Sequence, residues 1–368
     1  MKIVHILNEL KYSGAEIMYV DAASLFQKKG CELSVIATAP QRGDYSAQFE
    51  QAGYKVIHNP YPGRWNLFAR IRYLMKFINF LKNENYDVVH NHCNRLMWEM
   101  SFAAWMARKR SVTTFHSVFP SHIYSYLYHI MIRWSAKKLF GCKFQSISDS
   151  VYEHELNFFH NKTRKIYNWY GENRFSPASK NERKQIREEL NIPSDALVLI
   201  SIGGCNSNKR HVDVIRAVKL IQKKYNSVLY LHLGAGDTED EEKELVKLLK
   251  LKKNVRFYGN QRDVRKYLIA SDIYVMTSRY EGISITTIEA MACGVPAILY
   301  NVIGLRDFNR TGENSLLISE NHTELAEKVI YLHLHPKMYI KLSERAIELV
   351  NKTFSLKTNA SEIYQLYL

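Results

Sequence analysis

Short apolar strand patterns alternate with helical patterns along almost the whole chain, and this alternation constrains the fold more than any other feature. The first such runs are KIVHIL, ELSVIAT, YKVIH and DVVHNH, which are too short for helices and rich in β-branched or apolar residues. Longer segments with a helical period separate many of these runs, and the first of them, GAEIMYVDAASLFQKKG, ends at Gly30. Strand–helix alternation predicts an α/β fold whose parallel sheets are covered by helices on both faces.

The alternation stops once, in the segment Asn168–Gln185, where turn-forming and charged residues show no apolar period. It restarts at ALVLISIGG and continues to about Thr323, after which the chain reads as helical. We therefore expect two Rossmann-like parallel-sheet domains, the first in residues 1–170 and the second in residues 186–353, joined by a linker at 171–185. Two open α/β domains in tandem normally face each other across a cleft, where ligands bind outside the carboxyl ends of the strands.

The cysteines and the apolar runs indicate where such a chain works. Five cysteines are scattered through 368 residues and no two have the C-x-x-C spacing, which predicts neither a disulfide framework nor a cysteine-rich zinc site. This usage fits a reducing cytosol. The opening MKIVHIL reads as a strand rather than a secretory leader, and no apolar run approaches the roughly 18 residues of a membrane span. We expect a cytoplasmic protein that is soluble or sits on a membrane surface.

Positive charge is concentrated in one region of the chain. The formal net charge is +15, and residues 51–150 contain 14 Lys and Arg against 4 Asp and Glu, a net +10. Such a field predicts an anionic partner, which could be anionic lipid, nucleic acid or a polyanionic substrate. The alternative is a solvated basic surface with no partner.

Two segments of this basic region combine cations with apolar and aromatic residues. They are RWNLFARIRYLMKFINFLKN, which is apolar along Leu67, Ile71, Leu74, Ile78 and Leu81, and SHIYSYLYHIMIRWSAKK. Basic amphipathic helices with aromatic residues suit a bilayer interface. Helices of this kind also simply pack on a parallel sheet, so the pattern leaves both interpretations open.

Glycine-bearing turns recur directly after predicted strands. They hold Gly14, Gly203 with Gly204, Gly234 with Gly236, and Gly282. Glycine lets the backbone approach a phosphate, and the helix start behind it offers N–H groups and a partial positive charge. Several such turns at one cleft favour a phosphorylated ligand. The chain has neither G-x-x-x-x-G-K-[ST] nor a G-x-G-x-x-G after its first strand, which argues against a P-loop nucleotidase and common NAD binding.

The segment EGISITTIEAMACGVPAI resembles the donor-site signature of retaining GT-B glycosyltransferases of family 4, also called group 1. The family pattern E-G-x6-E-A-M-A-x-G-x-P is present at every fixed position, from Glu281 to Pro296. LKYSGAE, TFHS, SIGGCNSNKRH, LGAGD and VRFYGNQRDVRKYLIASDIYVMTS resemble further family segments. FSLKTNASEIYQLY resembles the final family helix, which crosses back to the first domain. The resemblance therefore implies a GT-B fold and assigns residues 354–368 to the first domain.

The resemblance also implies roles for single residues. Glu289 would bind the nucleotide ribose and Glu281 the donor sugar. Lys209 and Gly203 would meet the phosphates, Gly14 would let the first domain close over them, and His116 would face the sugar or reacting centre. The backbone at the start of the predicted helix would hold the diphosphate through Gly282, Ile283, Ser284, Ile285 and Thr286. Carboxylates accept adjacent O–H groups well, and a lysine can neutralise charge that grows on a leaving phosphate.

Two departures from the family pattern affect these roles. The family commonly has an arginine where this chain has Gly204, and we expect Arg210 or another cation to substitute for it. The family linker N-G-[VI]-D reads NWYGEN, so only Asn168 matches. No D-x-D is present, and the resemblance implies no bound metal or other cofactor. His90 and His92 share one strand face and form a candidate metal pair, but the sequence provides no third ligand.

These observations lead to one expected function. It is the transfer of a sugar, with retention, to a hydroxyl of a cell-surface glycan or its lipid-linked precursor. The expected donor is a UDP-sugar, and the expected place is the cytoplasmic face of the membrane. Within enzymes, the alternative is a sugar-nucleotide epimerase or hydrolase on the same scaffold. A basic nucleic-acid-binding protein is the alternative from another class, but no nucleic-acid-binding module occurs in the chain.

Overall fold

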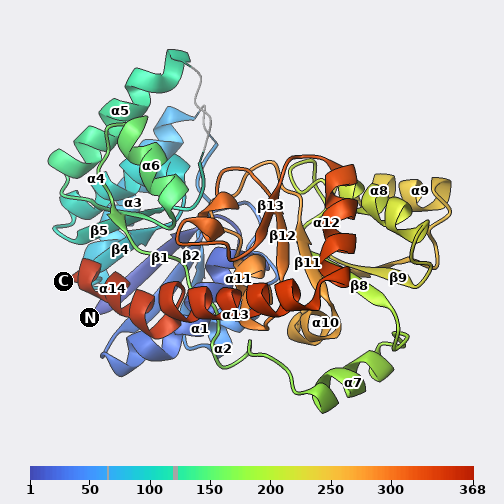
Figure 1. Ribbon diagram of the computed structural model, residues 1–368. Helices are drawn as coiled ribbons and strands as arrows, with labels where there is room; N and C mark the ends of the chain where they lie inside the picture. The colour runs from blue at the N-terminus through green and yellow to red at the C-terminus, as the bar shows by residue number, and fades with distance from the viewer. Residues whose placement is uncertain (64–65, 119–122) are drawn as a thin grey trace. The chain divides into compact units, whose positions relative to one another are not determined.

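The computed structural model describes residues 1–63, 66–118 and 123–368, with the side chains of 123–125 excepted. It divides into two compact units, Met1–Trp169 with Leu356–Leu368, and Tyr170–Ser355 (Figure 1). Each unit is a parallel sheet covered by helices, which confirms the predicted α/β class with two Rossmann-like domains. Arg64 and Trp65 of the first basic segment, and Ser121 and His122 of the second, lie outside the described residues.

The sheet of the first unit has the order β3-β2-β1-β4-β5-β6-β7. Its strand pairs are all parallel, so crossovers connect successive strands and the order reverses between β1 and β4. The strands are β1 (Lys2–Leu7), β2 (Glu32–Ala37), β3 (Lys55–His58), β4 (Val88–Asn91), β5 (Arg110–Phe115), β6 (Lys143–Ser146) and β7 (Arg164–Lys165).

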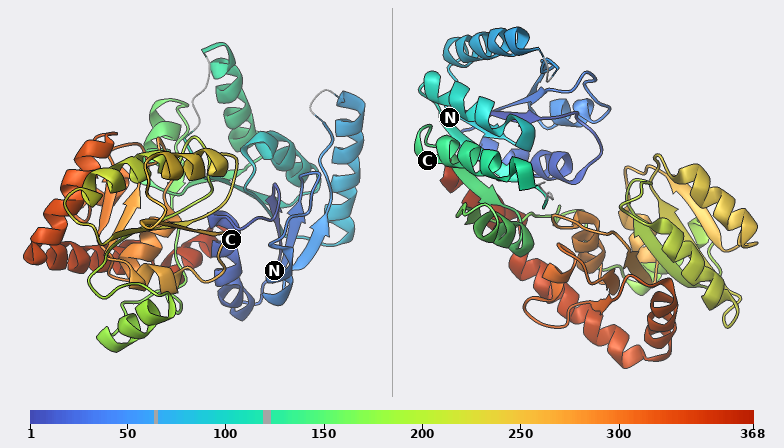
Figure 2. Two further views of the ribbon diagram at one scale, coloured as in Figure 1. Left: turned by 90° about the vertical axis from the view of Figure 1, so that its right-hand side faces the viewer. Right: turned by 90° about the horizontal axis from the view of Figure 1, so that it is seen from above.

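Helices lie on both faces of this sheet (Figure 2). α4 packs against α3 and α5 on one face, while α14 packs beside α1. The C-terminal helix α14 therefore belongs to the first unit, although it follows the second in sequence. The helices are α1 (Gly14–Lys28), α2 (Ser46–Gln51), α3 (Leu67–Asn83), α4 (Met97–Met106), α5 (Ile123–Lys138), α6 (Asp149–Asn157), α14 (Leu356–Tyr367) and the short 3-10 helix η1 (Asn94–Leu96).

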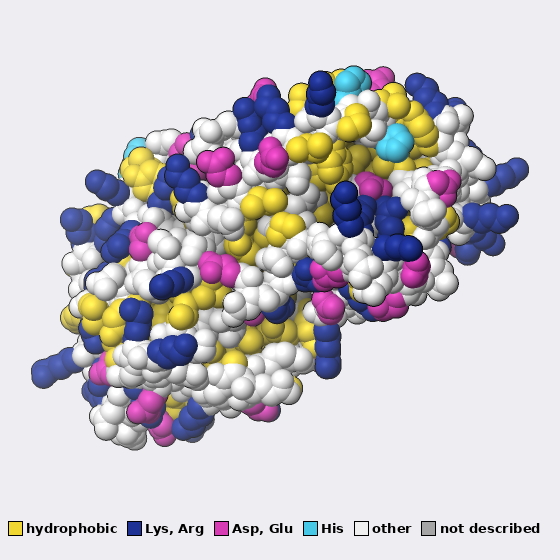
Figure 3. Space-filling view, turned by 60° about the horizontal axis from the view of Figure 1, so that its bottom comes forward, with side chains coloured by type: hydrophobic (Ala, Val, Ile, Leu, Met, Phe, Trp, Pro, Cys, Tyr) yellow, Lys and Arg dark blue, Asp and Glu magenta, His cyan; other side chains and the backbone are white. Residues whose placement is uncertain are grey.

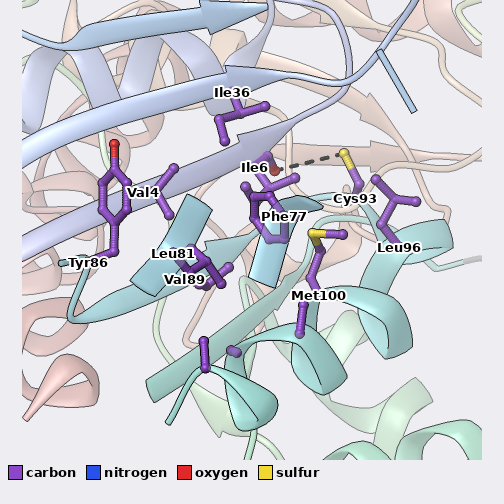
Figure 4. Packing of buried hydrophobic residues seen from close by; sticks show 13 residues of the cluster. Val4, Ile6, Ile36, Phe77, Leu81, Tyr86, Val89, Cys93, Leu96 and Met100 are labelled. Carbon is purple, nitrogen blue, oxygen red and sulfur yellow. Dashed lines mark hydrogen bonds between the residues drawn. The ribbon is translucent and has the colours of Figure 1, made fainter. Parts of the chain in front are cut away.

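The core of the first unit lies between this sheet and the helices α3 and α4 (Figure 4). Val4, Ile6 and Val89 come from β1 and β4, and they meet Phe77 of α3 and Met100 of α4. All five side chains are buried. Because these strands are covered on both faces, every residue of β4 and five of the six residues of β1 are buried.

The second unit repeats the same topology with the sheet order β10-β9-β8-β11-β12-β13, and its strand pairs are also parallel. Every residue of β8 and β9 is buried. The strands are β8 (Leu197–Ile202), β9 (Val228–Leu233), β10 (Val255–Gly259), β11 (Ile273–Met276), β12 (Ala297–Tyr300) and β13 (Leu316–Ile318). The helices are α7 (Lys180–Glu189), α8 (His211–Gln222), α9 (Glu239–Leu248), α10 (Arg265–Ala270), α11 (Ile285–Ala292), η2 (Arg306–Asn309), α12 (His322–Leu334) and α13 (Pro336–Thr353).

The prediction of an irregular segment over Asn168–Gln185 is wrong at its C-terminal end, because residues 180–185 belong to α7. Ser179 caps this helix by accepting a hydrogen bond from the Glu182 backbone N–H. None of the residues of α7 is fully buried. The helix is instead held by ion pairs from Arg183 and Arg187 to Asp272, at 2.6 and 2.9 Å. A helix that is attached through charges shows no apolar period, which explains why the sequence pattern missed it.

Candidate functional site

In the second unit, the strand order reverses between β8 and β11, which pair directly. Open parallel sheets bind ligands outside the carboxyl ends of the strands at such a reversal. Two loops start there, one from β8 to α8 with Gly203 and Lys209, and one from β11 to α11 with Glu281 and Gly282. The topology thus brings together two segments that the sequence analysis identified separately.

Hydrogen bonds join these two loops to each other. Asn208 Nδ2 donates to the Tyr280 carbonyl at 3.0 Å, and the Arg279 backbone N–H donates to the Asn208 carbonyl at 2.9 Å. Thr277 Oγ1 donates to the Lys209 carbonyl at 2.9 Å. Sequence reasoning did not find Asn208, because its partners lie about 70 residues away; its turn-forming neighbours in CNSNK were the available signal.

Lys209 and Glu281 form an ion pair between the two loops, with Nζ and Oε1 2.6 Å apart. The Lys209 side chain is 19% exposed and that of Glu281 is 15% exposed, so water reaches both groups only in part. Gly203 leaves room for the lysine, because a Cβ there would lie 3.1 Å from Lys209 Cε. When a ligand enters, such a partly shielded cation can bind a phosphate, and the carboxylate can accept a hydroxyl.

Gly304 fixes the backbone position of Glu281. It has φ +83°, and a Cβ added there would lie 2.2 Å from the Glu281 carbonyl oxygen. The Glu281 N–H donates to the Ile303 carbonyl at 3.0 Å, so the two segments run against each other. The close approach requires glycine at position 304, and the sequence analysis did not single this residue out.

Helix α11 begins next to Glu281 and contains Glu289. Ser284 is its N-cap and accepts hydrogen bonds from Thr287 N at 3.2 Å and from Thr287 Oγ1 at 2.8 Å. The Thr286 hydroxyl is occupied by a hydrogen bond with Tyr274 OH at 2.8 Å. The backbone N–H of Thr286 lies in the first turn, where a helix offers N–H groups to a ligand. Glu289 is buried one turn after the helix start. The helix start, Lys209 and Glu281 therefore come together in one unit.

Arg210 follows Lys209 but is directed to other partners. Its guanidinium contacts Asp213 at 2.7 Å and Glu320 at 2.5 Å, and it lies over the Tyr300 ring. These two carboxylates already balance its charge. The structure therefore does not assemble Arg210 with the Lys209–Glu281 pair, and the expected substitute for an arginine at position 204 has no contact there to support it.

In the first unit, Gly14 is the first residue of α1, directly after the loop that follows β1. Ser13 Oγ donates a hydrogen bond to Glu16 Oε2. Burial raises the pKa of the Glu16 carboxyl to about 7, although the hydrogen bond from Ser13 opposes this shift. Sequence reasoning did not select Glu16; the S-x-x-E pattern of a capping box was the signal in the sequence.

His116 follows β5 and is the outer member of a chain of imidazoles. His116 Nε2 lies 3.0 Å from His92 Nδ1, and His92 Nε2 lies 3.1 Å from His5 Nδ1. His116 is partly exposed, whereas His92 and His5 are buried. Burial lowers the pKa of His116 to about 4 and that of His5 to about 3, so the chain is neutral near pH 7. The residue found by resemblance is thus held by His92, which directly follows β4, and His92 is held in turn by His5 of β1.

His90 and His92 lie with His5 in one buried cluster whose ring nitrogens are within 4.8 Å of one another, but hydrogen bonds occupy His90. Thr114 Oγ1 donates to Gln145 Oε1 at 2.5 Å, so it must accept from His90 Nε2 at 2.7 Å. His90 Nδ1 then accepts from Tyr367 OH of α14, at 2.6 Å. Both nitrogens of His90 are used, and a metal there would have to replace one of these hydrogen bonds.

Two family models match the chain. One is described as Glycosyltransferase Family 4 and matches residues 12–203, which is more than half of the chain. The other is described as Glycosyl transferases group 1 and matches residues 182–349, where the Lys209–Glu281 pair and α11 lie.

Similar proteins cover the full length of the chain. EpsD of Bacillus subtilis (strain 168), which bears a glycosyltransferase name, is 25% identical over 355 residues, covering 93% of this chain and 91% of EpsD. The capsular polysaccharide biosynthesis glycosyltransferase CapH of Staphylococcus aureus is 20% identical over 380 residues, covering 100% of this chain and 99% of CapH. The crystal structure of Anabaena HepE in complex with UDP has the same fold, with a TM-score of 0.85 and 19% identity over 99% of both chains.

Proposed function

This chain belongs to glycosyltransferase family 4 and is therefore a glycosyltransferase, and we propose that it transfers a sugar from a nucleotide diphosphate sugar, a UDP-sugar, to a hydroxyl of a glycan or a lipid-linked acceptor, with retention of configuration. The product would be part of a cell-surface polysaccharide. CapH acts in capsular polysaccharide biosynthesis and HepE is known with UDP, and both support this choice of donor and pathway by analogy.

The observation that carries the proposal is the Lys209–Glu281 ion pair beside the start of α11, at the β8–β11 reversal. A donor diphosphate would lie on the N–H groups at this helix start, where the helix dipole favours negative charge. Lys209 would turn from Glu281 to the phosphate, and Glu281 would accept hydroxyls of the sugar. Glu289 would bind the ribose hydroxyls, so neither carboxylate needs to transfer a proton.

In the proposed reaction the protein supplies position and charge. Lys209 stabilises the negative charge that develops on the leaving phosphate, which is the contribution expected of a preorganised cation. The acceptor hydroxyl attacks the same face of the sugar from which the nucleotide leaves, and a donor phosphate oxygen takes its proton. This route needs no protein nucleophile and, as we propose it, no metal. His116, at the end of its imidazole chain, faces the sugar as a neutral group.

A thermal-shift screen of nucleotide sugars tests the donor. Specific ligands raise the melting temperature by mass action, so UDP-sugars should shift it while matched GDP- and ADP-sugars do not. A shift with none of the nucleotide sugars would contradict the proposal. Product analysis with donor alone separates the alternative, because an epimerase or hydrolase would form product without an acceptor and a transferase would form little.

We also propose that the first unit docks on an anionic membrane surface through α3 and α5, which both pack on α4. Lys and Arg are scattered over the face drawn in Figure 3, with Asp and Glu among them, so net charge alone does not identify a docking surface. The exposed apolar side chains do. They recur at helical intervals and comprise Leu67, Phe68, Ile71 and Met75 of α3 and Leu127, Tyr128, Met131 and Trp134 of α5.

The structure divides the predicted apolar side of α3 into two parts. Leu67 and Ile71 are exposed, whereas Leu74, Ile78 and Leu81 pack on the core. The buried half packs on the first unit as an ordinary sheet-covering helix does, and the exposed half is the part that we propose for docking. No helix among the described residues is long and apolar enough to cross a bilayer.

Co-sedimentation with vesicles tests this surface. Phe68→Ser, which changes a side chain that is 87% exposed, should reduce binding to vesicles that contain anionic phosphatidylglycerol. Leu248→Ser is the matched control, because Leu248 is 77% exposed but lies in the second unit. Binding should also fall as salt rises, since screening weakens the attraction of Arg72 and Lys76 to anionic lipid. Equal binding by the two variants, or binding that ignores salt, would refute this docking surface.

A further inference from the structure

A second polar cluster lies in the interior of the second unit, and the β8–α8 loop that holds Lys209 also supplies one of its members. It consists of Cys205 in that loop, His232 on β9 and Glu242 on α9. All three residues are at most 1% exposed. The proposed transfer reaction uses none of them, and they come from three separate segments, so no short motif in the sequence joins them.

We propose that Cys205, His232 and Glu242 form a binding site for a divalent metal ion of the zinc type. Cys205 Sγ lies 3.8 Å from His232 Nε2, and His232 Nε2 lies 2.9 Å from Glu242 Oε2. All three candidate ligand atoms lie within 4.8 Å of one another. A tetrahedral zinc ion with its usual bond lengths places sulfur and nitrogen about 3.6 Å apart, and nitrogen and oxygen about 3.3 Å apart. The observed distances differ from these values by less than about 0.5 Å.

The directions of the polar groups also support a bound cation. Glu242 Oε2 has no hydrogen-bond partner among the described residues, although His232 Nε2 is only 2.9 Å away. The two atoms are close enough for a charge interaction, and two ligand atoms directed at a common third point approach each other in the same way. Buried polar atoms without partners are rare and indicate an unassigned ion or water.

The surroundings hold the carboxylate ready for such an ion. Glu242 Oε1 accepts a hydrogen bond from Thr238 Oγ1 at 2.8 Å, which fixes the carboxylate plane and leaves Oε2 for the site. Hydrogen bonds of this kind around metal ligands orient them and tune their affinity. The His211 ring lies 4.4 Å from the His232 ring, and His211 Nε2 also lacks a partner among the described residues. His232 Nδ1 lacks one as well, so coordination through Nε2 requires a water molecule or a small shift of the ring to satisfy the Nδ1–H. Metal-binding groups are thus concentrated at this point.

The combination of ligands indicates the kind of metal. A thiolate, an imidazole and a carboxylate are all ligands that zinc accepts, while magnesium and calcium require oxygen ligands. Three protein ligands leave one tetrahedral position for a water molecule. The metal would tie the β8–α8 loop to β9 and α9. Because all three ligands are buried, we assign it a structural role, although structural zinc sites usually have four protein ligands. This inference departs from the expectation that the chain binds no metal. That expectation rested on the absence of C-x-x-C and D-x-D motifs and on the resemblance to enzymes that work without a bound metal.

Metal analysis of the purified full-length chain tests the site. We expect about one zinc ion per chain after equilibration with zinc and dialysis. Cys205→Ser and Glu242→Gln should each weaken zinc binding beyond the roughly 10- to 100-fold effect of outer hydrogen-bond changes. Cys142→Ser is the matched control, because Cys142 is also buried but lies in the first unit, and it should bind zinc like the unchanged chain.

Cobalt provides a readout that does not depend on whether the variants fold. Co²⁺ bound to the unchanged chain should show the thiolate-to-cobalt charge-transfer absorption, and zinc should displace it. No stoichiometric zinc in the unchanged chain, no charge-transfer band with cobalt, or equal zinc binding by Cys205→Ser and the control would each overturn the proposal. Since these measurements involve no nucleotide sugar, their outcome is independent of the proposed transfer reaction.

Discussion

Replacing Lys209 with methionine separates its part in stability from its part in the reaction. Methionine keeps an aliphatic chain beside Gly203 but removes the charge that pairs with Glu281. Loss of one partner of a buried ion pair costs about 3–5 kcal/mol, and an exposed pair contributes about 0–1 kcal/mol. Because both side chains are less than one fifth exposed, we expect Lys209→Met to lower the free energy of unfolding by ~1–3 kcal/mol.

Turnover should fall further than this loss of stability explains. Removing one preorganised charge that stabilises a leaving group lowers kcat by about 10²–10³-fold, or ~3–4 kcal/mol. The double variant Lys209→Met with Glu281→Gln removes both charges. It should recover part of the lost stability, because no carboxylate is then left unpaired in the site, while its turnover stays low.

The assay compares the chemical denaturation midpoint and the steady-state rate of sugar transfer for the two single variants and the double variant. If the double variant regains the turnover of Glu281→Gln alone, then Lys209 only neutralises Glu281. That outcome would refute its assignment to the leaving phosphate. Equal activity of Lys209→Met and the unchanged chain would remove the lysine from the site altogether.

Three further changes address other parts of the two units. Glu289→Ala should weaken UDP binding by about 10–100-fold in calorimetry, since hydrogen bonds to a charged group contribute ~1.5–3 kcal/mol, and unaltered affinity would count against its ribose role. Gly304→Ala should destabilise the protein and weaken donor binding, because its Cβ would collide with the Glu281 carbonyl; Gly259→Ala, also at positive φ but with open space, should leave donor binding intact. Burial raises the pKa of Glu16 from 4.5 to about 7 against the hydrogen bond from Ser13, so the folded state binds its proton more tightly, and stability should fall as pH rises from about 4.5 to about 7. Glu16→Gln should flatten that decline, by at most about 3 kcal/mol, in denaturation at a series of pH values.

The fold was predictable because the signals that determine it are local. Parallel strands buried on both faces, such as β8 and β9, read as apolar runs, and amphipathic helices read by their period. The signal failed at α7, where Arg183 and Arg187 attach the helix to Asp272 through charge. A helix without a buried face leaves no periodic trace in the sequence.

The site was predictable only in part. Family motifs identified Lys209 and Glu281, but not that they form a pair in the free protein. The sequence did not reveal three further residues, because their importance depends on their surroundings. Gly304 lies against the Glu281 carbonyl, Asn208 bonds to the β11–α11 loop, and burial raises the pKa of Glu16. Each of these is a tertiary relation between segments that are distant in sequence, or a property of burial.

His116 shows what the structure adds to a residue that the sequence had already identified. In a neutral imidazole chain each ring donates once, so the hydrogen bonds run either outward from His5 to His116 or inward. The inward direction leaves a buried N–H on His5 Nε2, which has no partner among the described residues. Since orphaned buried N–H groups are rarer than unpaired acceptors, the outward direction is favoured. His116 then presents Nδ1–H, a hydrogen-bond donor suited to a sugar or phosphate oxygen rather than a base for the acceptor hydroxyl.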